Sequence, residues 1–208
     1  MSTVTNIFTG VEGRTGQSIT ATSDPSTATC IQFLNEAIQW ILSLCVESKS
    51  ELGRTTGTIT TTSTIASYSG LSTMYAPYEF GWIVKTSSRV RIDLVTEEDT
   101  LDFNPSNTAE PTKFYIDGSN NVIFLDTPND AYTIKIPYWP TPTTLTAVGN
   151  TVPFNGLFDN LLIEFLTMRI QNRDEYDLSF EYKWLQFLLT GAKRIIAIRK
   201  GTKFGVSL

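Results

Sequence analysis

The chain has 208 residues, which is long enough for one well-packed core or for a core with a smaller second unit. Its net charge of −5 argues against a general nucleic-acid binder, because neutralising phosphates requires a surplus of Lys and Arg. The chain contains no histidine, which excludes a Ser-His-Asp triad, a Cys-His pair and a zinc site with histidine ligands.

Neither a membrane span nor a leader is expected. The sequence has no run of 18 apolar residues, and its first five residues lack the basic and apolar regions of a secretory signal. This favours a soluble, intracellular product. The only cysteines, Cys30 and Cys45, would lie roughly 22 Å apart along one helix, which is too far for a disulfide. We therefore expect two buried, reduced thiols and no metal or cofactor site.

The N-terminal region predicts an arm followed by a helix. Residues 1–25 are rich in Thr, Ser and Gly and predict a brief helix or an extended segment. The glycines of residues 10–16 lack the Gly-Lys-Ser/Thr ending of a phosphate-binding loop and predict only a turn. Ser26 and Thr27 are good N-cap residues. Apolar residues then recur at helical spacing to about residue 47: Ile31, Leu34, Ile38, Ile41, Leu42 and Cys45.

The middle of the chain changes to a strand pattern. Thr-rich residues 56–67 are β-prone and form a poor helix by propensity. Short strands are predicted at residues 80–84, 90–95, 114–116, 122–125 and 132–138. Such spacing predicts an antiparallel sheet, a sandwich or a small barrel. Pro137, Pro140 and Pro142 are expected to end the strands, because proline cannot donate to a ladder.

After Pro153 the helical period returns and predicts two helices, the second over about residues 174–199. The second helix carries two apolar stripes. The first contains Tyr176, Phe180, Trp184, Phe187, Ile195 and Ile198, and the other contains Leu178, Leu185, Leu189, Ala192 and Ile196. An ordinary surface helix buries one stripe, so this helix needs two partners. Either both stripes are buried inside a bundle, or one stripe meets a neighbouring subunit.

The C-terminal residues from Gly191 onward contain five cations and no Asp or Glu: Lys193, Arg194, Arg199, Lys200 and Lys203. Cations at a helix C-terminus favour the helix dipole, which explains part of this bias. The tail of residues 201–208 carries one aromatic side chain, Phe204, and is either a docking peptide or a frayed end.

Two further patterns offer functional alternatives. Glu97, Glu98 and Asp99 could form a carboxylate pair of the kind that glycosidases use, although clustered surface acids more often form a solvated turn. Four aromatic residues on β-elements are expected to be exposed and could stack on sugars in a carbohydrate-binding or other interaction module of a virion or surface protein: Tyr78, Trp82, Tyr138 and Trp139.

Taken together, these patterns predict an α+β fold. A helical bundle, made of an N-terminal helix and two long C-terminal helices, carries an antiparallel β-rich insert. The expected divisions are an N-terminal arm at 1–25, the bundle at 26–53 and 151–200, the insert at 54–150, and a C-terminal tail at 201–208.

This layout resembles a known family. The N-terminal helix carries Phe-Leu-Asn-Glu-Ala at 33–37, and the insert ends in a Pro-x-x-x-Tyr-x-Ile-x-x-Pro-Tyr strand at 128–138. A Pro-rich link to Leu145 and Thr146 then leads into the two closing helices. Over about residues 28–200 the chain is similar to the head-to-tail adaptor (connector) proteins of tailed bacteriophages.

The resemblance implies a structural protein without enzymatic activity or cofactor. It implies a homo-oligomeric ring, expected to be a dodecamer, made in the host cytoplasm and located in the neck of the virion. Its partners would be the portal protein above and tail or nozzle proteins below. DNA would pass through the channel without specific binding, which suits a net acidic chain. No membrane partner is implied.

Two sets of residues are then expected to make contacts. Arg199, Lys200, Lys203 and Phe204 are the portal-docking residues expected in the tail. Leu178, Leu185, Leu189 and Ile196 are expected at the ring interface, where the second stripe of the last helix would meet a neighbour.

Overall fold

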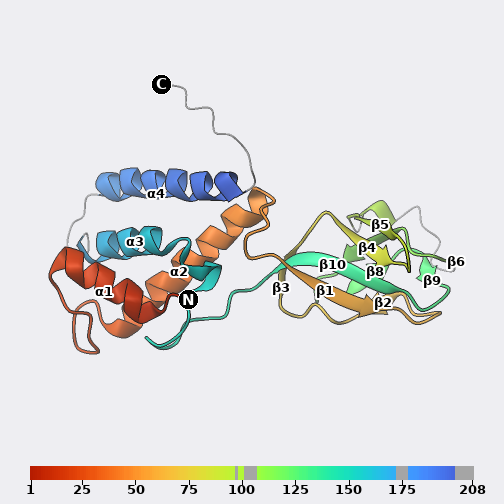
Figure 1. The fold of residues 1–208 in the computed structure, drawn as a ribbon, viewed down its shortest axis with the longest axis horizontal. Coiled ribbons are helices and arrows are strands. Elements are labelled where there is room, and N and C mark those ends of the chain that lie inside the picture. Colours follow the sequence, from red (N-terminus) through yellow and green to blue (C-terminus); the bar gives the residue numbers. More distant parts are fainter. Residues whose placement is uncertain (97, 101–106, 172–177, 200–208) are drawn as a thin grey trace, which may run out of the picture. The chain divides into compact units, whose positions relative to one another are not determined.

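The computed structural model describes residues 1–96, 98–100, 107–171 and 178–199. The chain divides into two compact units, one made of Met1–Gly53 with Pro142–Leu208 and the other of Arg54–Thr141. In Figure 1 the first unit holds the helices, in red, orange, cyan and blue, and the second holds the strands, in yellow and green.

The helical unit contains four α-helices in the described residues: α1 Val4–Thr15, α2 Thr27–Glu47, α3 Asp159–Gln171 and α4 Leu178–Arg199. A short 3₁₀ turn, Pro153–Gly156, precedes α3. Ser26 caps α2 as expected, since its side chain accepts a hydrogen bond of 3.3 Å from the Thr29 N–H. All four helices contribute to one apolar core.

Helix α1 lies in the segment that was expected to be a brief helix or an extended arm, so the helix alternative holds. Its buried residues Val4, Ile7, Phe8 and Val11 recur at helical spacing, and this burial outweighs the poor helix propensity of its glycines. The turn predicted over residues 10–16 is therefore wrong, apart from the αL residue that ends the helix.

Two glycines let the outer helices approach α3. A Cβ atom at Gly10 of α1 would lie 2.5 Å from Ile163 Cδ1, and one at Gly191 of α4 would lie 3.1 Å from Leu161 Cδ2. Arg14 of α1 also forms an ion pair with Glu164 of α3. These contacts fix where the helices pack.

Helix α2 is long and apolar enough to cross a membrane when judged by length and composition alone. Half of its most apolar 18-residue window is buried within the protein. Its fully buried residues, such as Leu34, Ile38 and Ile41, form the centre of the helical core. Core helices of soluble proteins have the same composition, so the core accounts for the apolarity of α2.

The returning chain after residue 142 is held against α2 and the N-terminus. The Asn35 side chain donates to the Leu145 C=O (3.0 Å) and accepts from the Leu145 N–H (2.8 Å). The Asn150 side-chain oxygen accepts hydrogen bonds from the N–H groups of Thr146 and Ala147. The backbone C=O of Asn150 accepts one from the Val4 N–H. The motif residues that carry the family resemblance thus include a direct contact between residues 35 and 145.

The strand unit contains ten described strands. They are β1 Thr55–Thr60, β2 Ser67–Tyr68, β3 Met74–Pro77, β4 Phe80–Val84, β5 Arg89–Leu94, β6 Thr108–Ala109, β7 Lys113–Ile116, β8 Val122–Phe124, β9 Thr127–Pro128 and β10 Thr133–Pro140. Eight form one sheet in the order β1-β10-β4-β5-β7-β8-β2, with β3 also paired to β10, while β6 and β9 form a separate pair. A 3₁₀ turn, Glu98–Thr100, follows β5.

Strand β10 runs through Pro137, where the sequence predicted a strand end. The Pro137 C=O accepts a hydrogen bond of 3.0 Å from the Tyr78 N–H, so the backbone groups of Pro137 face the gap between β3 and β4. A missing N–H is tolerated there, because no strand residue is paired with Pro137 on that side. The strand therefore continues to Pro140.

The predicted fold class is wrong. An α+β helical bundle with an antiparallel β-rich insert was expected, whereas the described part of the chain is mixed α/β, with four helices and a large, nearly closed sheet. The sheet is also not wholly antiparallel, since β5 and β7 pair in parallel. The sheet is more than an insert because it buries an apolar core of its own, centred on Ile83, Ile92, Phe114, Phe124 and Ile134.

Candidate interaction surfaces

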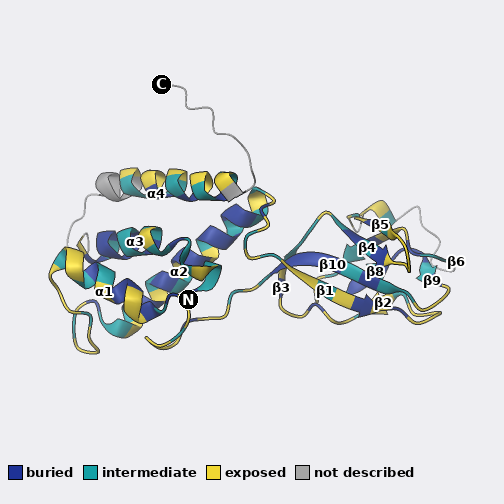
Figure 2. Cartoon of the chain, in the orientation of Figure 1, coloured by how far each residue is buried: buried dark blue, intermediate teal, exposed yellow. Residues whose placement is uncertain are grey.

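Helix α4 has a buried face and an exposed apolar face. Leu188, Ala192 and Ile196 are at most 2% exposed and point into the helical core. On the opposite side, Phe187 is 61% and Ile198 64% exposed, and the Phe187 ring stacks on Trp184 with centroids 5.4 Å apart. Figure 2 shows this alternation of buried and exposed residues along the helix. The predicted stripe with Ala192 and Ile196 faces the core. The other stripe is mixed, since Trp184 and Ile195 pack against the core while Phe187 and Ile198 are exposed.

The residues expected at the ring interface lie on the bundle side of α4. Ile196 is buried, while Leu185 and Leu189 are partly buried and pack against the helical core. The side chain of Leu178 lies outside the described residues. Leu185 and Leu189 keep part of their surface in a groove of about 310 Å³, which α2 and α3 complete with Trp40, Phe165 and Arg169 among others.

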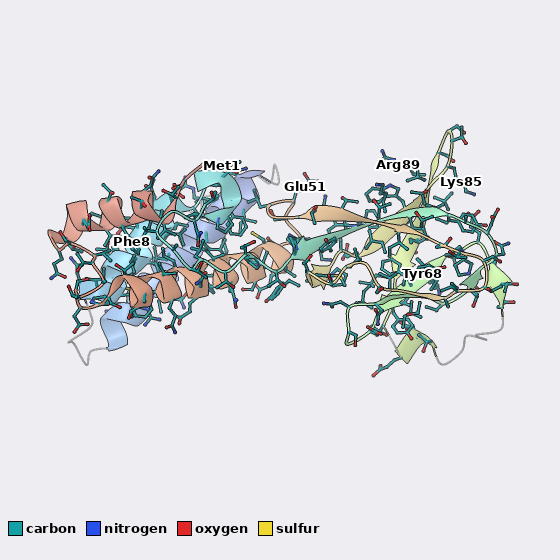
Figure 3. All side chains as sticks on the ribbon, turned by 90° about the horizontal axis from the view of Figure 1, so that it is seen from below. Met1, Phe8, Glu51, Tyr68, Lys85 and Arg89 are labelled. Carbon is teal, nitrogen blue, oxygen red and sulfur yellow. The ribbon has the colours of Figure 1, made fainter. Side chains whose placement is uncertain are left out.

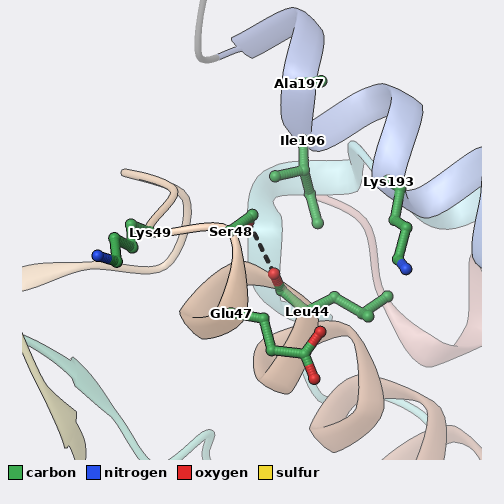
Figure 4. A pocket seen from close by; sticks show the side chains of 7 residues that line it. All are labelled: Leu44, Glu47, Ser48, Lys49, Lys193, Ile196 and Ala197. Atoms are coloured by element: carbon green, nitrogen blue, oxygen red, sulfur yellow. Dashed lines mark hydrogen bonds between the residues drawn. The ribbon is translucent and has the colours of Figure 1, made fainter.

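A second hollow lies where α2 and α4 end, as Figure 4 shows. It has a volume of about 570 Å³ and is lined by Leu44, Glu47, Ser48, Lys49, Lys193, Ile196 and Ala197. The Ser48 hydroxyl donates a hydrogen bond of 2.7 Å to the Leu44 C=O and so closes the end of α2. The lining mixes apolar side chains with charges of both signs, which gives the hollow no single ligand chemistry.

The residues expected to dock onto the portal lie outside the part of the chain that the structure describes. Lys200, Lys203 and Phe204 follow the end of α4, and the side chain of Arg199 is not among the described ones.

The outer face of β4 and β5 combines arginines with aromatic rings. The Arg91 guanidinium lies 4.4 Å from the centroid of the Phe80 ring, and that of Arg89 lies 5.6 Å from the Trp82 ring. Arg89 is labelled on the strand unit in Figure 3. At such distances a cation is attracted to the negative face of the ring. The rings are therefore partly covered by cations.

This arrangement bears on the four aromatic residues considered for sugar stacking. Tyr138 and Trp139 are buried, at 9% and 2% exposed, so the expectation that they are exposed is wrong. Tyr78 is half-buried beneath the Arg54 guanidinium, 4.5 Å away, and also contacts Trp139. Only Trp82 and the covered edge of Tyr78 remain near the surface, and they do not form an open stacking platform.

Two residues of the acidic run, Glu98 and Asp99, lie in a short 3₁₀ turn. The Thr96 N–H and hydroxyl donate hydrogen bonds of 2.9 and 2.8 Å to the Asp99 carboxylate. These bonds favour the ionised form and lower the pKa of Asp99. A general acid needs a raised pKa, so Asp99 is adapted for capping the turn rather than for proton transfer. Glu97 lies outside the described residues.

Both cysteines are free and buried in α2, as expected. Burial raises the pKa of Cys30 to about 11 and that of Cys45 to about 12, because a thiolate is poorly solvated in an apolar core. In the described ranges of the chain, no cluster of three or more His, Cys, Asp or Glu side chains could hold a metal ion.

Sequence reasoning missed two features of these surfaces. The helical period identified both stripes of α4 but not which of their side chains face solvent, because their exposure depends on how α2 and α3 pack. Sequence reasoning also missed the Asn35–Leu145 pair, whose partners are 110 residues apart and share no local pattern. The only sequence signal for the arginine–aromatic pairs was the alternating residue pattern that predicted β4 and β5.

The described surfaces fit a structural protein that works through contacts with other macromolecules. A family model described as the SU10 adaptor protein matches residues 3–203. The chain therefore belongs to the SU10 adaptor protein family, and it is a phage adaptor-type component of the virion. This confirms the coarser part of the resemblance drawn from the sequence. A comparison with curated proteins found no match.

Proposed function

We propose that the chain is the head-to-tail adaptor of its phage, a dodecameric ring in the virion neck that joins the portal to tail or nozzle proteins and encloses the DNA channel. Membership of the adaptor family supports this role. The observation that carries it is the two-sided helix α4, which buries one face in its own bundle and exposes apolar residues on the other.

The proposed contact between neighbouring copies runs along α4. Phe187 and Ile198 are separated by 11 residues, or about three helical turns, so they lie on the same face. Phe187, stacked on Trp184, and Ile198 are the exposed apolar groups of this face, and the exposed Arg194 lies between them. We propose that this mixed surface is the one that a neighbouring copy covers. Of the four residues expected at the ring interface, Leu185 and Leu189 remain in this proposal because they keep surface in the adjoining groove, and Leu178 remains a prediction. Ile196 is buried in the core of its own chain and is not proposed as a ring contact.

The α4 contact is tested by changing Phe187 and Ile198 to serine together. The proposed contact would bury both apolar side chains, so their loss should reduce ring formation on purified portal about tenfold or more. The matched control is Val148→Ser, which removes an apolar side chain that is 42% exposed in the loop before α3. Native mass spectrometry of the portal complex counts the bound copies. Equal counts for the double variant and the control would place the ring contact elsewhere.

Portal docking is assigned to the C-terminal segment with Arg199, Lys200, Lys203 and Phe204. Its composition supports this, since three cations can steer an encounter and one aromatic side chain can anchor it. Phe204→Ala should weaken docking more than Lys203→Ala at physiological salt, because one exposed charge is screened. Deleting residues 200–208 provides the stronger test, and portal binding as tight as that of the full chain would refute the assignment.

The charge of the chain supports the proposed channel. At a net charge of −5, twelve copies would present an acidic ring, which disfavours lasting contacts with DNA phosphates. DNA would therefore pass without specific binding.

A further inference from the structure

Strand β1 is one of the two unpaired edges of the large, nearly closed sheet. It stands at the end of the strand order and pairs with β10 alone. Proteins usually protect such edges with very short strands, charged residues, proline or bulges. The opposite edge, β2, is only two residues long. By contrast, β1 has six residues (TTGTIT) without charge or proline, and its pairing with β10 has no register shift.

The backbone groups at this edge can be identified from the register. The Thr61 N–H donates a hydrogen bond of 2.9 Å to the Tyr132 C=O. Antiparallel residues alternate between pairs that face each other with hydrogen bonds and pairs that do not. The N–H and C=O groups of Thr56, Thr58 and Thr60 therefore point away from β10. Pro137, the partner of Thr56, agrees with this, because its C=O is directed to Tyr78 on the other side.

These three threonines are exposed, and Figure 2 colours much of β1 accordingly. Among the described residues, their backbone N–H and C=O groups have no hydrogen-bond partner. A row of regularly spaced donors and acceptors is complementary to the backbone of another extended chain, which would add a strand to the sheet.

The charge beside the edge defines the partner. The Lys135 ammonium donates a hydrogen bond of 2.5 Å to the Thr58 hydroxyl, which places this cation above β1. Lys135 is opposite Trp82, which is opposite Arg91, so the three side chains share one face of the sheet. Arg91 is already paired with Asp93 at 2.6 Å, so Lys135 is the cation best placed to meet an incoming strand.

A second copy of β1 does not fit this edge. Pairing two β1 strands about a two-fold axis near Thr58 would bring the two Lys135 ammonium groups onto the same face, on either side of the seam. Like charges placed across neighbouring strands are destabilising. An acidic strand instead gains a charge pair at the same position.

We propose that β1 binds an extended acidic segment of another protein as an additional strand. Acidic side chains at alternate positions of that segment lie over Lys135, and the apolar side chains between them lie on the inner face beside Ile59 and Leu71, whose side chain covers Gly57. The inference concerns the strand unit and goes beyond the proposed ring, so it stands or falls separately from portal binding.

The probe is a fluorescent peptide of alternating Glu and Val, titrated into the full chain and followed by fluorescence anisotropy. A peptide of alternating Lys and Val is the matched control. We expect the Glu peptide to bind and to slow amide exchange at Thr56, Thr58 and Thr60. The affinity of the Lys peptide should be lower by a factor of about ten or more. Absence of binding by the Glu peptide, or equal binding by both peptides, overturns the proposal.

Two variants locate the site. Thr58→Pro removes an N–H that does not bond to β10, so the sheet should fold while binding of the Glu peptide falls about tenfold, the size expected for one lost hydrogen bond. Thr58→Val keeps that N–H and is the control. Lys135→Glu should exchange the preference of the two peptides. If Thr58→Pro fails to fold, the peptide preference of Lys135→Glu decides. The acidic partner is refuted if Lys135→Glu still prefers the Glu peptide. It is also refuted if the wild-type chain dimerises and Thr58→Pro abolishes the dimer.

Discussion

At the scale of single residues, this protein depends on polar side chains that hold distant backbone segments. Asn35 satisfies both backbone groups of Leu145, a residue that is only 4% exposed. Buried backbone groups are costly when unpaired, so this one side chain fixes where the chain re-enters the helical unit. The thiols of Cys30 and Cys45 contribute apolar volume to the core, and the Cys30 thiol also donates a long hydrogen bond of 3.9 Å to the Pro25 C=O.

We predict that Asn35→Ala destabilises the helical unit by about 1–3 kcal/mol, because the Leu145 N–H and C=O lose their partners. Gln32→Ala is the control on the same helix, since Gln32 bonds only to Glu36 on the exposed surface. That change should stay within about 0.5 kcal/mol. Urea unfolding monitored by circular dichroism measures both values. A similar loss for both variants would show that the Asn35 pair is unimportant.

We also predict slow alkylation of Cys30 and Cys45 in the native protein. With pKa values of about 11 and 12, almost no thiolate exists near neutral pH, and burial blocks access as well. Labelling should become fast only when denaturant unfolds α2. Rapid labelling of both thiols without denaturant would contradict their placement in the core.

At the scale of elements, the sequence predicted periodic segments well and failed where a distant partner decides. The apolar spacing of α2 and the alternation of β4 and β5 identified those elements, because each buries one face. Helix α1 was left open, since its glycines obscure a helix that packing against Ile163 stabilises. The prediction of a strand end at Pro137 was wrong, because the gap between β3 and β4 accommodates this proline. That gap is a tertiary feature, which no local pattern shows.

The turn between β7 and β8 gives a pH prediction. The Asn121 side chain and backbone, and then the Ser119 N–H, donate hydrogen bonds to the Asp117 carboxylate and lower its pKa below the ordinary value of 3.8. A lowered folded-state pKa stabilises the fold at pH values above the unfolded pKa, and this contribution is lost as the pH falls through the folded pKa.

We therefore expect the melting temperature of the strand unit to fall as the pH drops below about 4, with Asp99 acting in the same direction. Asp117→Asn replaces the charged acceptor by a neutral amide, so the melting temperature of this variant at neutral pH should be lower than that of the wild type. Because residue 117 can then no longer titrate, the melting temperature should also depend less on acid. Thermal melts by circular dichroism across this pH range test the effect. Parallel curves for the two proteins would exclude a contribution from Asp117.

At the scale of the whole molecule, two units with separate cores serve one structural role. The helical unit exposes Phe187 and Ile198 on α4, and the strand unit exposes the edge strand β1 and the cations beside it. Membership of the SU10 adaptor family indicates interaction with other virion components, and we propose that both surfaces serve such contacts. The sequence patterns identified the kind of protein, whereas the assignment of surfaces required the packed structure.

The central claim is that this chain forms a ring on the portal. Its most direct test is single-particle electron microscopy of purified portal rings mixed with the full-length chain. We predict an added ring of density with twelve copies on one face of the portal, continuous with the portal channel. Bare portal rings, with the chain remaining monomeric in the same mixture, would contradict the claim.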